Sequence, residues 1–272
     1  MYYKIIQPSA ILSQFIKHYW IMETDAYEGD VCERVIPTGS IQLMFHYKKP
    51  FVVKNINNKS LTQPRSIISG INNTFFDVST HGEAGVIAVS FLPSGACNFF
   101  RFPMSEIENQ SFDLCDILNK KIKQVEEQVC LAKNIGERIL IIEHFLREQL
   151  SPVKHHDYKL IQQAINLINQ HQGQANILEL SEKLSVTSKN LERKFSSLVG
   201  KTPKQYSKLV RFQSVILDMS RNPDSSLTEL AYKNGYFDQS HFIKDFKLYS
   251  GYTPGDFWLN CSCDHLETDF GF

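Results

Sequence analysis

Hydrophobic positions recur with helical spacing in two similar stretches near the end of the 272-residue chain. In each stretch, apolar residues three, four or seven positions apart line one face of a short helix, and a second such helix follows a tight turn. The first stretch carries Ile177, Leu180, Leu184, Leu191, Phe195 and Leu198, and the second carries Leu227, Leu230, Ala231, Phe242 and Phe246.

The turns between these helices predict two helix-turn-helix units. Residues 185–188 form the first turn, with Ser188 as the N-cap of the next helix. Gly235 lies where the second turn needs a positive φ, and Asp238 or Ser240 would cap the helix after it. Most helical hairpins do not bind DNA. Two in the same register, however, favour duplication of a DNA-reading unit, whose second helix lies in the major groove.

A single long helix is predicted between the two units. Gly200 ends the helix before it, and Pro203 suits its first turn. A helix from about Pro203 to Arg221 spans roughly 28 Å. Adjacent major-groove faces on one side of B-DNA lie about 34 Å apart. One rigid chain could therefore read two successive turns of a duplex.

The segment from about Tyr158 to Trp258 resembles the DNA-binding domain of the AraC/XylS family of bacterial transcription regulators. Ser181 and Val215 depart from residues usual in that family, and Val215 implies slightly different packing between the units. Tyr236 replaces a usual Phe but keeps the aromatic ring, so it still counts as a match. The matching positions are Leu191, Arg193, Phe195, Gly200, Thr202, Pro203, Tyr206 and Arg211, then Glu229, Leu230, Ala231, Gly235, Tyr236, Ser240, Phe242, Phe246, Lys247, Gly251, Tyr252, Thr253 and Pro254.

The resemblance also implies which residues face DNA. Arginine can pair with guanine, asparagine or glutamine with adenine, and lysine suits phosphate. The alternative for each residue is an ordinary solvated face. The resemblance further implies double-stranded DNA and RNA polymerase as partners, and a homodimer. The implied DNA-facing residues are Lys189, Asn190, Glu192 and Arg193 in the first unit and Gln239, Ser240, His241 and Lys244 in the second.

Charge gives moderate support to DNA binding. The whole chain has a formal net charge of zero. Residues 154–258, however, contain 14 Lys and Arg against 10 Asp and Glu, a net of +4. Because phosphate neutralisation supplies much of DNA affinity, we expect binding that weakens markedly as salt rises.

The first 110 residues show short apolar runs between turn signals, typical of a β-barrel or sandwich. Two helical inserts are predicted, at Ala10–Trp20 and Ser94–Phe100. With the helical remainder, this predicts an α+β fold. This half resembles the small cupin-like sensor domains attached to some AraC-like regulators. The predicted strands are Tyr2–Ile6, Arg34–Ile36, Ile41–Phe45, Phe51–Val53, Ser66–Ser69, Phe75–Val78 and Val86–Phe91.

Such domains bind a small effector or mediate dimerisation in the wider family. Trp20, Arg34 and His46 are weak candidates for a ligand pocket here, and each has a structural alternative. Metal-dependent cupins need a His-x-His pair, which this half lacks. No catalytic residue, metal ligand or cofactor is therefore assigned, although a cupin-like enzyme fused to a DNA-binding domain stays an alternative, as does a helical protein-interaction module.

Residues 111–152 are predicted to form a helical linker. Its narrow apolar seams could pack within one chain or against a second copy, and the second is slightly favoured. The resulting domains are a β-rich effector or dimerisation domain (1–110), the linker, a DNA-binding domain (153–260) and an acidic tail (261–272) that includes Cys261 and Cys263. A hinge is placed at residues 151–156. No signal peptide or membrane span is predicted, so a cytoplasmic protein is expected.

Overall fold

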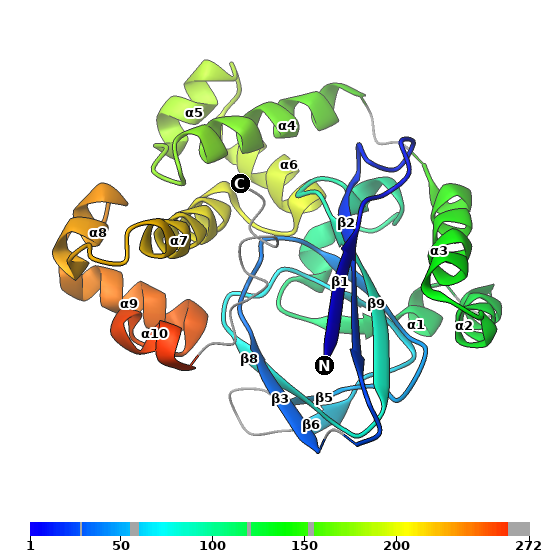
Figure 1. The fold of residues 1–272 in the computed structure, drawn as a ribbon. Coiled ribbons are helices and arrows are strands. Elements are labelled where there is room, and N and C mark those ends of the chain that lie inside the picture. Colours follow the sequence, from blue (N-terminus) through cyan, green and yellow to red (C-terminus); the bar gives the residue numbers. More distant parts are fainter. Residues whose placement is uncertain (28, 55–59, 119–120, 152–154, 261–272) are drawn as a thin grey trace.

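The N-terminal half of the computed structural model is built from two antiparallel sheets (Figure 1), and the structure describes residues 1–272 except 28, 55–59, 119–120, 152–154 and 261–272. One sheet has the strand order β1-β2-β9-β4-β7-β10, and the other has the order β3-β8-β5-β6. The strands are β1 (Tyr2–Ile6), β2 (Ile16–Thr24), β3 (Asp30–Val35), β4 (Gln42–His46), β5 (Val52–Lys54), β6 (Ser60–Thr62), β7 (Ser66–Ser69), β8 (Phe76–His81), β9 (Ala84–Phe91) and β10 (Ser111–Asp113). The predicted α+β fold class is confirmed.

Strand β2 corrects the predicted helix at Ala10–Trp20. Residues 10–15 form turns, and β2 begins at Ile16. Helical spacing and strand alternation both fit this apolar stretch, so local pattern could not decide between them. Pairing with β1 on one side and β9 on the other satisfies the backbone of β2 along its length, which favours the strand. The insert predicted at Ser94–Phe100 contains the short 3-10 helix η1 (Ala96–Asn98).

The helical linker packs against its own chain. It contains α1 (Leu114–Leu118), α2 (Lys121–Leu131) and α3 (Ile135–Gln149). Of the predicted seam residues, Val125 and Ile135 are half-buried and pack against the core, and the others are buried: Ile122, Val129, Ile139, Ile142 and Leu146. The preference for a dimer contact along these seams was therefore wrong, because the apolar faces are already covered within the chain.

Two short helical hairpins and a long helix make up most of the C-terminal half. Its helices are α4 (His155–Gln170), α5 (Ile177–Lys183), α6 (Ser188–Val199), α7 (Pro203–Arg221), α8 (Leu227–Lys233), α9 (Gln239–Ser250) and α10 (Pro254–Asn260). The bounds of α7 confirm the predicted joining helix. A capping box between Thr202 and Gln205 fixes its start, with Pro203 in its first turn.

The turn chemistry of the hairpins is largely as predicted. Gly235 has a φ of 69°, and the side chain of Asp238 caps α9 by accepting from the backbone of His241. The N-cap of α6 is Thr187 rather than the predicted Ser188. Thr187 has the extended backbone of a cap, and its hydroxyl accepts from the backbone nitrogen of Asn190.

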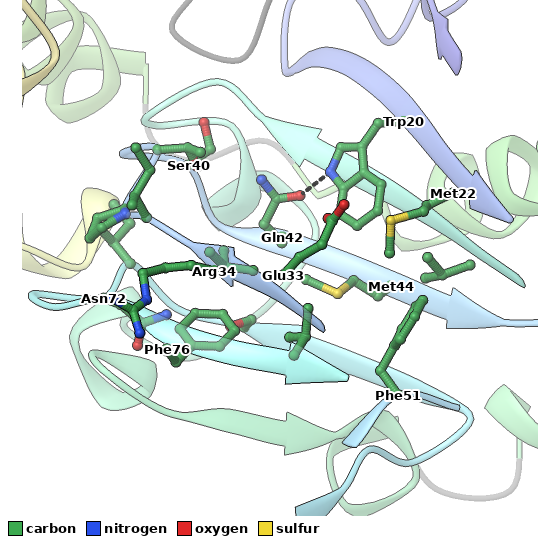
Figure 2. Close-up of a pocket in the computed structure, with 18 of the residues that line it drawn as sticks. Trp20, Met22, Glu33, Arg34, Ser40, Gln42, Met44, Phe51, Asn72 and Phe76 are labelled. Carbon is green, nitrogen blue, oxygen red and sulfur yellow. Dashed lines mark hydrogen bonds between the residues drawn. The ribbon is translucent and has the colours of Figure 1, made fainter. Parts of the chain in front are cut away.

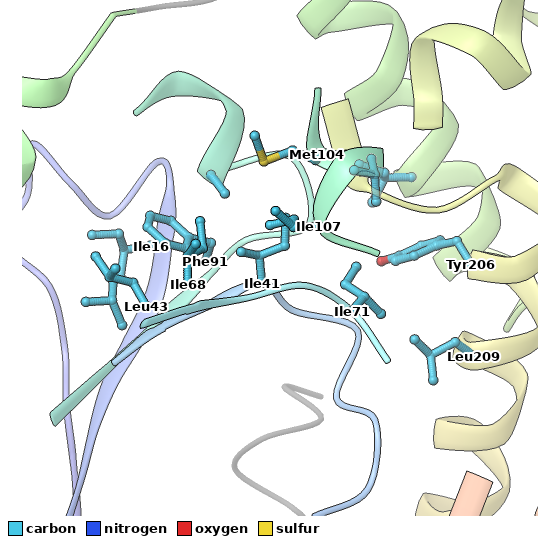
Figure 3. Close-up of a cluster of buried hydrophobic side chains, with 14 of the residues drawn as sticks. Ile16, Ile41, Leu43, Ile68, Ile71, Phe91, Met104, Ile107, Tyr206 and Leu209 are labelled. Atoms are coloured by element: carbon cyan, nitrogen blue, oxygen red, sulfur yellow. The ribbon is translucent and has the colours of Figure 1, made fainter. Parts of the chain in front are cut away.

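The two halves share one continuous hydrophobic core (Figure 3). Ile71 and Ile107 of the N-terminal half lie toward Tyr206 and Leu209 of α7. Met104, in the 3-10 helix η2 (Met104–Ile107), is fully buried beside the end of α6. This shared core fixes α7 against the sheets.

Some predictions fall on residues that the structure does not describe. The central part of the predicted hinge, residues 152–154, and the acidic tail with Cys261 and Cys263 lie outside the described residues. Within the described ranges, none of the helices combines the length and apolar content that crossing a membrane requires.

Candidate nucleic-acid interface

Each helical hairpin presents its second helix with one buried and one polar face. We call α5–α6 the first head and α8–α9 the second head, and the second helix of each is its recognition helix. Leu191, Phe195 and Val199 bury the inner face of α6. Phe242 and Phe246 do the same for α9, where Phe246 packs edge-on against Phe212 of α7. Phe195 of α6 packs against Tyr206 of α7, so both heads are fixed to the joining helix.

The residues expected to face DNA lie on the outer faces of these helices. Seven of the eight side chains are exposed, and Asn190 is half-buried. The exposed residues are Lys189, Glu192 and Arg193 on α6 and Gln239, Ser240, His241 and Lys244 on α9. The structure thus brings each group together on one helix surface, close to its N-terminal end.

Hydrogen bonds organise the polar face of the first head. Arg193 donates from Nη2 to Oδ1 of Asn190 at 3.0 Å. Lys194 has a different role, because its Nζ lies 2.6 Å from Asp157 of α4 and lowers the pKa of that carboxyl. No carboxylate of the described residues pairs with Lys189, so its charge is available to an incoming anion.

The second head has a matching arrangement. The Thr228 hydroxyl donates to Oε1 of Gln239 at 3.2 Å, which leaves the amide nitrogen of Gln239 free to donate outward. His241 lies 3.6 Å from Asp245 one turn along the helix. Lys244 forms no ion pair with the described carboxylates.

A junction that was not predicted joins the two heads. Arg211 of α7 donates to the backbone carbonyl oxygens of Gly173, ahead of the first head, and Gly235, in the turn of the second head. Gln174 donates from Nε2 to the carbonyl oxygen of Lys233 at 3.1 Å. Arg211 was part of the family signature in the sequence. Its acceptors are backbone carbonyl oxygens, which any residue type supplies, so the sequence could not reveal them.

A pocket of about 180 Å³ lies between the two sheets of the N-terminal half (Figure 2). Trp20 and Arg34 line it, as expected, whereas His46 does not. Trp20 donates from Nε1 to Oε1 of Gln42 at 2.9 Å, and this bond orients the indole on the wall. The apolar part of the lining comes from side chains that the sequence did not single out: Met22, Met44, Phe51, Phe76, Val78 and Val86.

Two family profiles match the chain. Residues 4–113 match a family described as a domain of unknown function (DUF6597). Residues 180–258 match a family described as a helix-turn-helix domain, and this stretch runs from within α5 through α6, α7, α8 and α9. This match supports the resemblance of the C-terminal half to the AraC/XylS family of regulators.

The chain also resembles one curated protein at the sequence level. It is 27% identical over 141 residues to the uncharacterized HTH-type transcriptional regulator YdeC of Bacillus subtilis (strain 168). The match covers 51% of this chain and 47% of YdeC, so the chain spans about half the length of this curated relative.

Solved structures with a similar arrangement are more distant. ToxT from Vibrio cholerae is 11% identical with a TM-score of 0.47, and the match covers 90% of this chain and 98% of that one. A ToxT structure with a bound unsaturated fatty acid is 12% identical with a TM-score of 0.46, covering 89% and 94%. The AraC-like transcriptional activator CuxR is 10% identical with a TM-score of 0.28, covering 79% and 87%.

One cluster of potential metal ligands occurs among the described residues. Donor atoms of Asp113, Cys115 and Glu126 lie within 4.8 Å of one another. The Ser66 hydroxyl already donates to Glu126 at 2.5 Å. Burial, together with the neighbouring Glu126, raises the pKa of the Cys115 thiol to about 11. A thiol that stays protonated at neutral pH is a poor metal ligand.

Proposed function

We propose that this chain is a sequence-specific DNA-binding transcription regulator whose N-terminal domain responds to a small molecule. The observation that carries the proposal is the pair of exposed polar recognition helices fixed to one 19-residue helix. A helix of that length, roughly 28 Å, suits two successive major-groove faces.

The side chains on the two heads supply the chemistry for direct readout. Arg193, steadied by Asn190, presents a guanidinium suited to the O6 and N7 atoms of guanine. Gln239, with its amide oxygen occupied by Thr228, presents an amide suited to adenine. Lys189 and Lys244 would contact phosphates and orient the heads on the duplex. Glu192 would accept from a cytosine amino group, and Ser240 and His241 would complete the second surface.

The pocket between the sheets is the proposed effector site. Its apolar and aromatic lining, with Gln42 and Arg34 as polar groups, suits an apolar or planar molecule. RNA polymerase and a second copy of the chain are proposed partners, and the compartment is the cytoplasm, where a bacterial regulator meets the chromosome. The seam residues of the linker that the structure describes are buried or half-buried within the chain, so the proposal places the dimer contact elsewhere.

The test is a binding titration with the full-length chain. A duplex is first selected from a random-sequence library, and its affinity is then measured at 50 mM and 200 mM salt. About four phosphate contacts would weaken binding by roughly two orders of magnitude between these concentrations. Failure to select any duplex, or affinity that does not change with salt, would reject the proposal.

The alternatives predict different results. A helical protein-interaction module would show no selection of a base sequence. A cupin-like enzyme would hold stoichiometric metal in the N-terminal half, which elemental analysis of the purified protein measures. Either result would require the heads to be reassigned.

A further inference from the structure

The two recognition helices end in the same way, because each is a copy of one repeated unit. Gly200 closes α6 and Gly251 closes α9, both in the left-handed conformation with φ of 88° and 76°. The following residues are Lys201-Thr202-Pro203 in the first copy and Tyr252-Thr253-Pro254 in the second. Lys201 and Tyr252 therefore occupy equivalent positions, immediately beyond the two recognition helices.

The N-terminal domain contacts Lys201 through a buried ion pair. The side chain of Lys201 is 1% exposed, and its Nζ lies 2.8 Å from Oε1 of Glu108. It also donates to Oδ1 of Asn73 at 2.7 Å and Oδ1 of Asn109 at 3.3 Å. All three protons of the ammonium group thus have an acceptor from the N-terminal domain. Gln205, one turn into α7, donates to the same Glu108 oxygen at 2.9 Å.

The same domain contacts Tyr252 through an arginine. The guanidinium carbon of Arg34 lies 4.6 Å from the centre of the Tyr252 ring and 4.2 Å from that of Phe75. Asp77 fixes the guanidinium by accepting from Nε at 2.8 Å and from Nη2 at 3.1 Å. The guanidinium of Arg34 can approach Tyr252 closely because residue 251 is glycine. A Cβ on Gly251 would lie 2.6 Å from Nη1 of Arg34.

These two contacts leave the proposed DNA-binding surfaces open. They hold residues beyond the C-terminal ends of α6 and α9, whereas the proposed DNA-facing residues lie nearer the N-terminal ends and are mostly exposed. A contact of this kind does not cover the heads. It fixes the direction in which each recognition helix points.

We propose that Glu108 and Arg34 are positioning residues, which hold Lys201 and Tyr252 and so set the angle between the two recognition helices. This inference rests on the proposed DNA-binding function. The contact with Tyr252 starts at the pocket wall, because Arg34 lines the pocket, and Asn72, the chain neighbour of Asn73, lines it too. Figure 2 shows Arg34 and Asn72 at one end of the pocket, with Met22 and Phe51 at the other.

The experiment uses the full-length chain and a duplex selected with it. Glu108→Gln removes the charge that holds Lys201, and Tyr252→Leu removes the ring that packs on Arg34. Glu106→Gln, in the same 3-10 turn but exposed, and Tyr232→Leu, 64% exposed on α8, are the matched controls. Duplexes in which the two recognised elements are moved by one base pair measure how strictly the heads are spaced.

A rigid pair of heads should lose roughly tenfold or more in affinity when one base pair is inserted or removed, because the second element moves out of reach. Glu108→Gln and Tyr252→Leu should each bind the parent duplex about tenfold more weakly and lose most of this spacing penalty. The controls should keep both the affinity and the penalty. A uniform loss on every duplex, with the penalty unchanged, would mean a merely structural role and would overturn the proposal.

A measurement without DNA separates this inference from the proposed function. Amide hydrogen exchange should quicken at residues 200–202 in Glu108→Gln and at residues 251–253 in Tyr252→Leu. Unchanged exchange would overturn the two contacts even if DNA binding is established. The wild-type chain could select no duplex although hydrogen exchange responds as expected. The DNA-binding proposal would then fail, and so would the proposal that the contacts set an angle for DNA binding. The two contacts are tested by separate variants, so a variant that does not fold leaves the other to decide.

Discussion

Arg211 donates from Nη1 to the backbone carbonyl oxygen of Gly235, 3.3 Å away. Its Nη2 donates to the carbonyl oxygen of Gly173 at 3.2 Å. One guanidinium on the joining helix therefore links the segment that precedes the first head to the turn within the second head. The planar, forked geometry of arginine makes this double contact, and the single ammonium group of lysine cannot reproduce it.

Arg211→Lys should lower both stability and duplex binding. Loss of one of the two charge-assisted hydrogen bonds should reduce the free energy of unfolding by about 1–2 kcal/mol. Urea unfolding measures this, and titration of the selected duplex measures the accompanying loss of affinity. Arg221→Lys, on the exposed end of the same helix, is the control. Equal behaviour of the two variants would show that the junction adds nothing.

Arg193→Ala should weaken DNA binding without affecting the fold. Removing a bidentate base contact costs about 1–3 kcal/mol and relaxes preference at one base position. A titration against single-base variants of the selected duplex tests both effects. Arg101→Ala, an exposed arginine of the N-terminal half, should change neither. An Arg193→Ala protein that binds as tightly and as selectively as the parent would remove Arg193 from the readout.

Glu143→Ala should destabilise the N-terminal half strongly. The side chain of Glu143 is 6% exposed and accepts from the backbone of Ser9, the Tyr19 hydroxyl and Arg147. Burial raises the pKa of Tyr19, and the carboxylate raises it further, so the hydroxyl remains a donor. Loss of this acceptor, which leaves the buried Tyr19 hydroxyl without its carboxylate partner, should cost about 1–3 kcal/mol. Thermal unfolding measures the cost, and Glu148→Ala, at an exposed site, should leave the melting temperature within a degree or two.

His46→Gln should make the chain less sensitive to acid. Burial lowers the pKa of His46 from 6.5 to about 4. The unfolded chain therefore takes up this proton first. The corresponding stability is present above pH 6.5 and is lost as the pH falls toward 4. Between pH 7.5 and pH 5 the wild type should lose about 2 kcal/mol more than His46→Gln.

Urea unfolding at the two pH values measures the His46 effect. His81, whose side chain is 75% exposed, is the natural control, and His81→Gln should keep the pH dependence of the wild type. An identical loss of stability in His46→Gln would mean that His46 already takes up its proton in the folded state.

The heads could be predicted closely because their signals are local. The spacing of Leu180, Leu191 and Phe195, the glycine in the second turn and the proline at the start of α7 each fix structure within a few residues. The structure places α7 at Pro203–Arg221, as the sequence indicated. Helical periodicity, caps and turn residues all favour the same arrangement there, which is why local reasoning succeeded.

Other features depend on partners far along the chain. Residues 16–20 became strand because β1 and β9 flank them, and no periodicity within the segment reports those neighbours. His46 was expected to line the pocket but is buried outside its lining, whereas Gln42 and Phe51 line it. Glu108 contacts Lys201, which lies 93 positions away in the sequence. In the sequence alone, each of these residues resembles an ordinary charged surface residue.

The unlike chemistry at Lys201 and Tyr252 makes the two copies of the duplicated unit non-interchangeable. A lysine at 252 would meet the like charge of Arg34, and a tyrosine at 201 would leave Glu108 without its counter-ion. If the two copies were exchanged, neither would form its present contact with the β-rich domain, even in the absence of DNA. The residue that follows each recognition helix therefore determines which surface of the N-terminal domain that copy can contact.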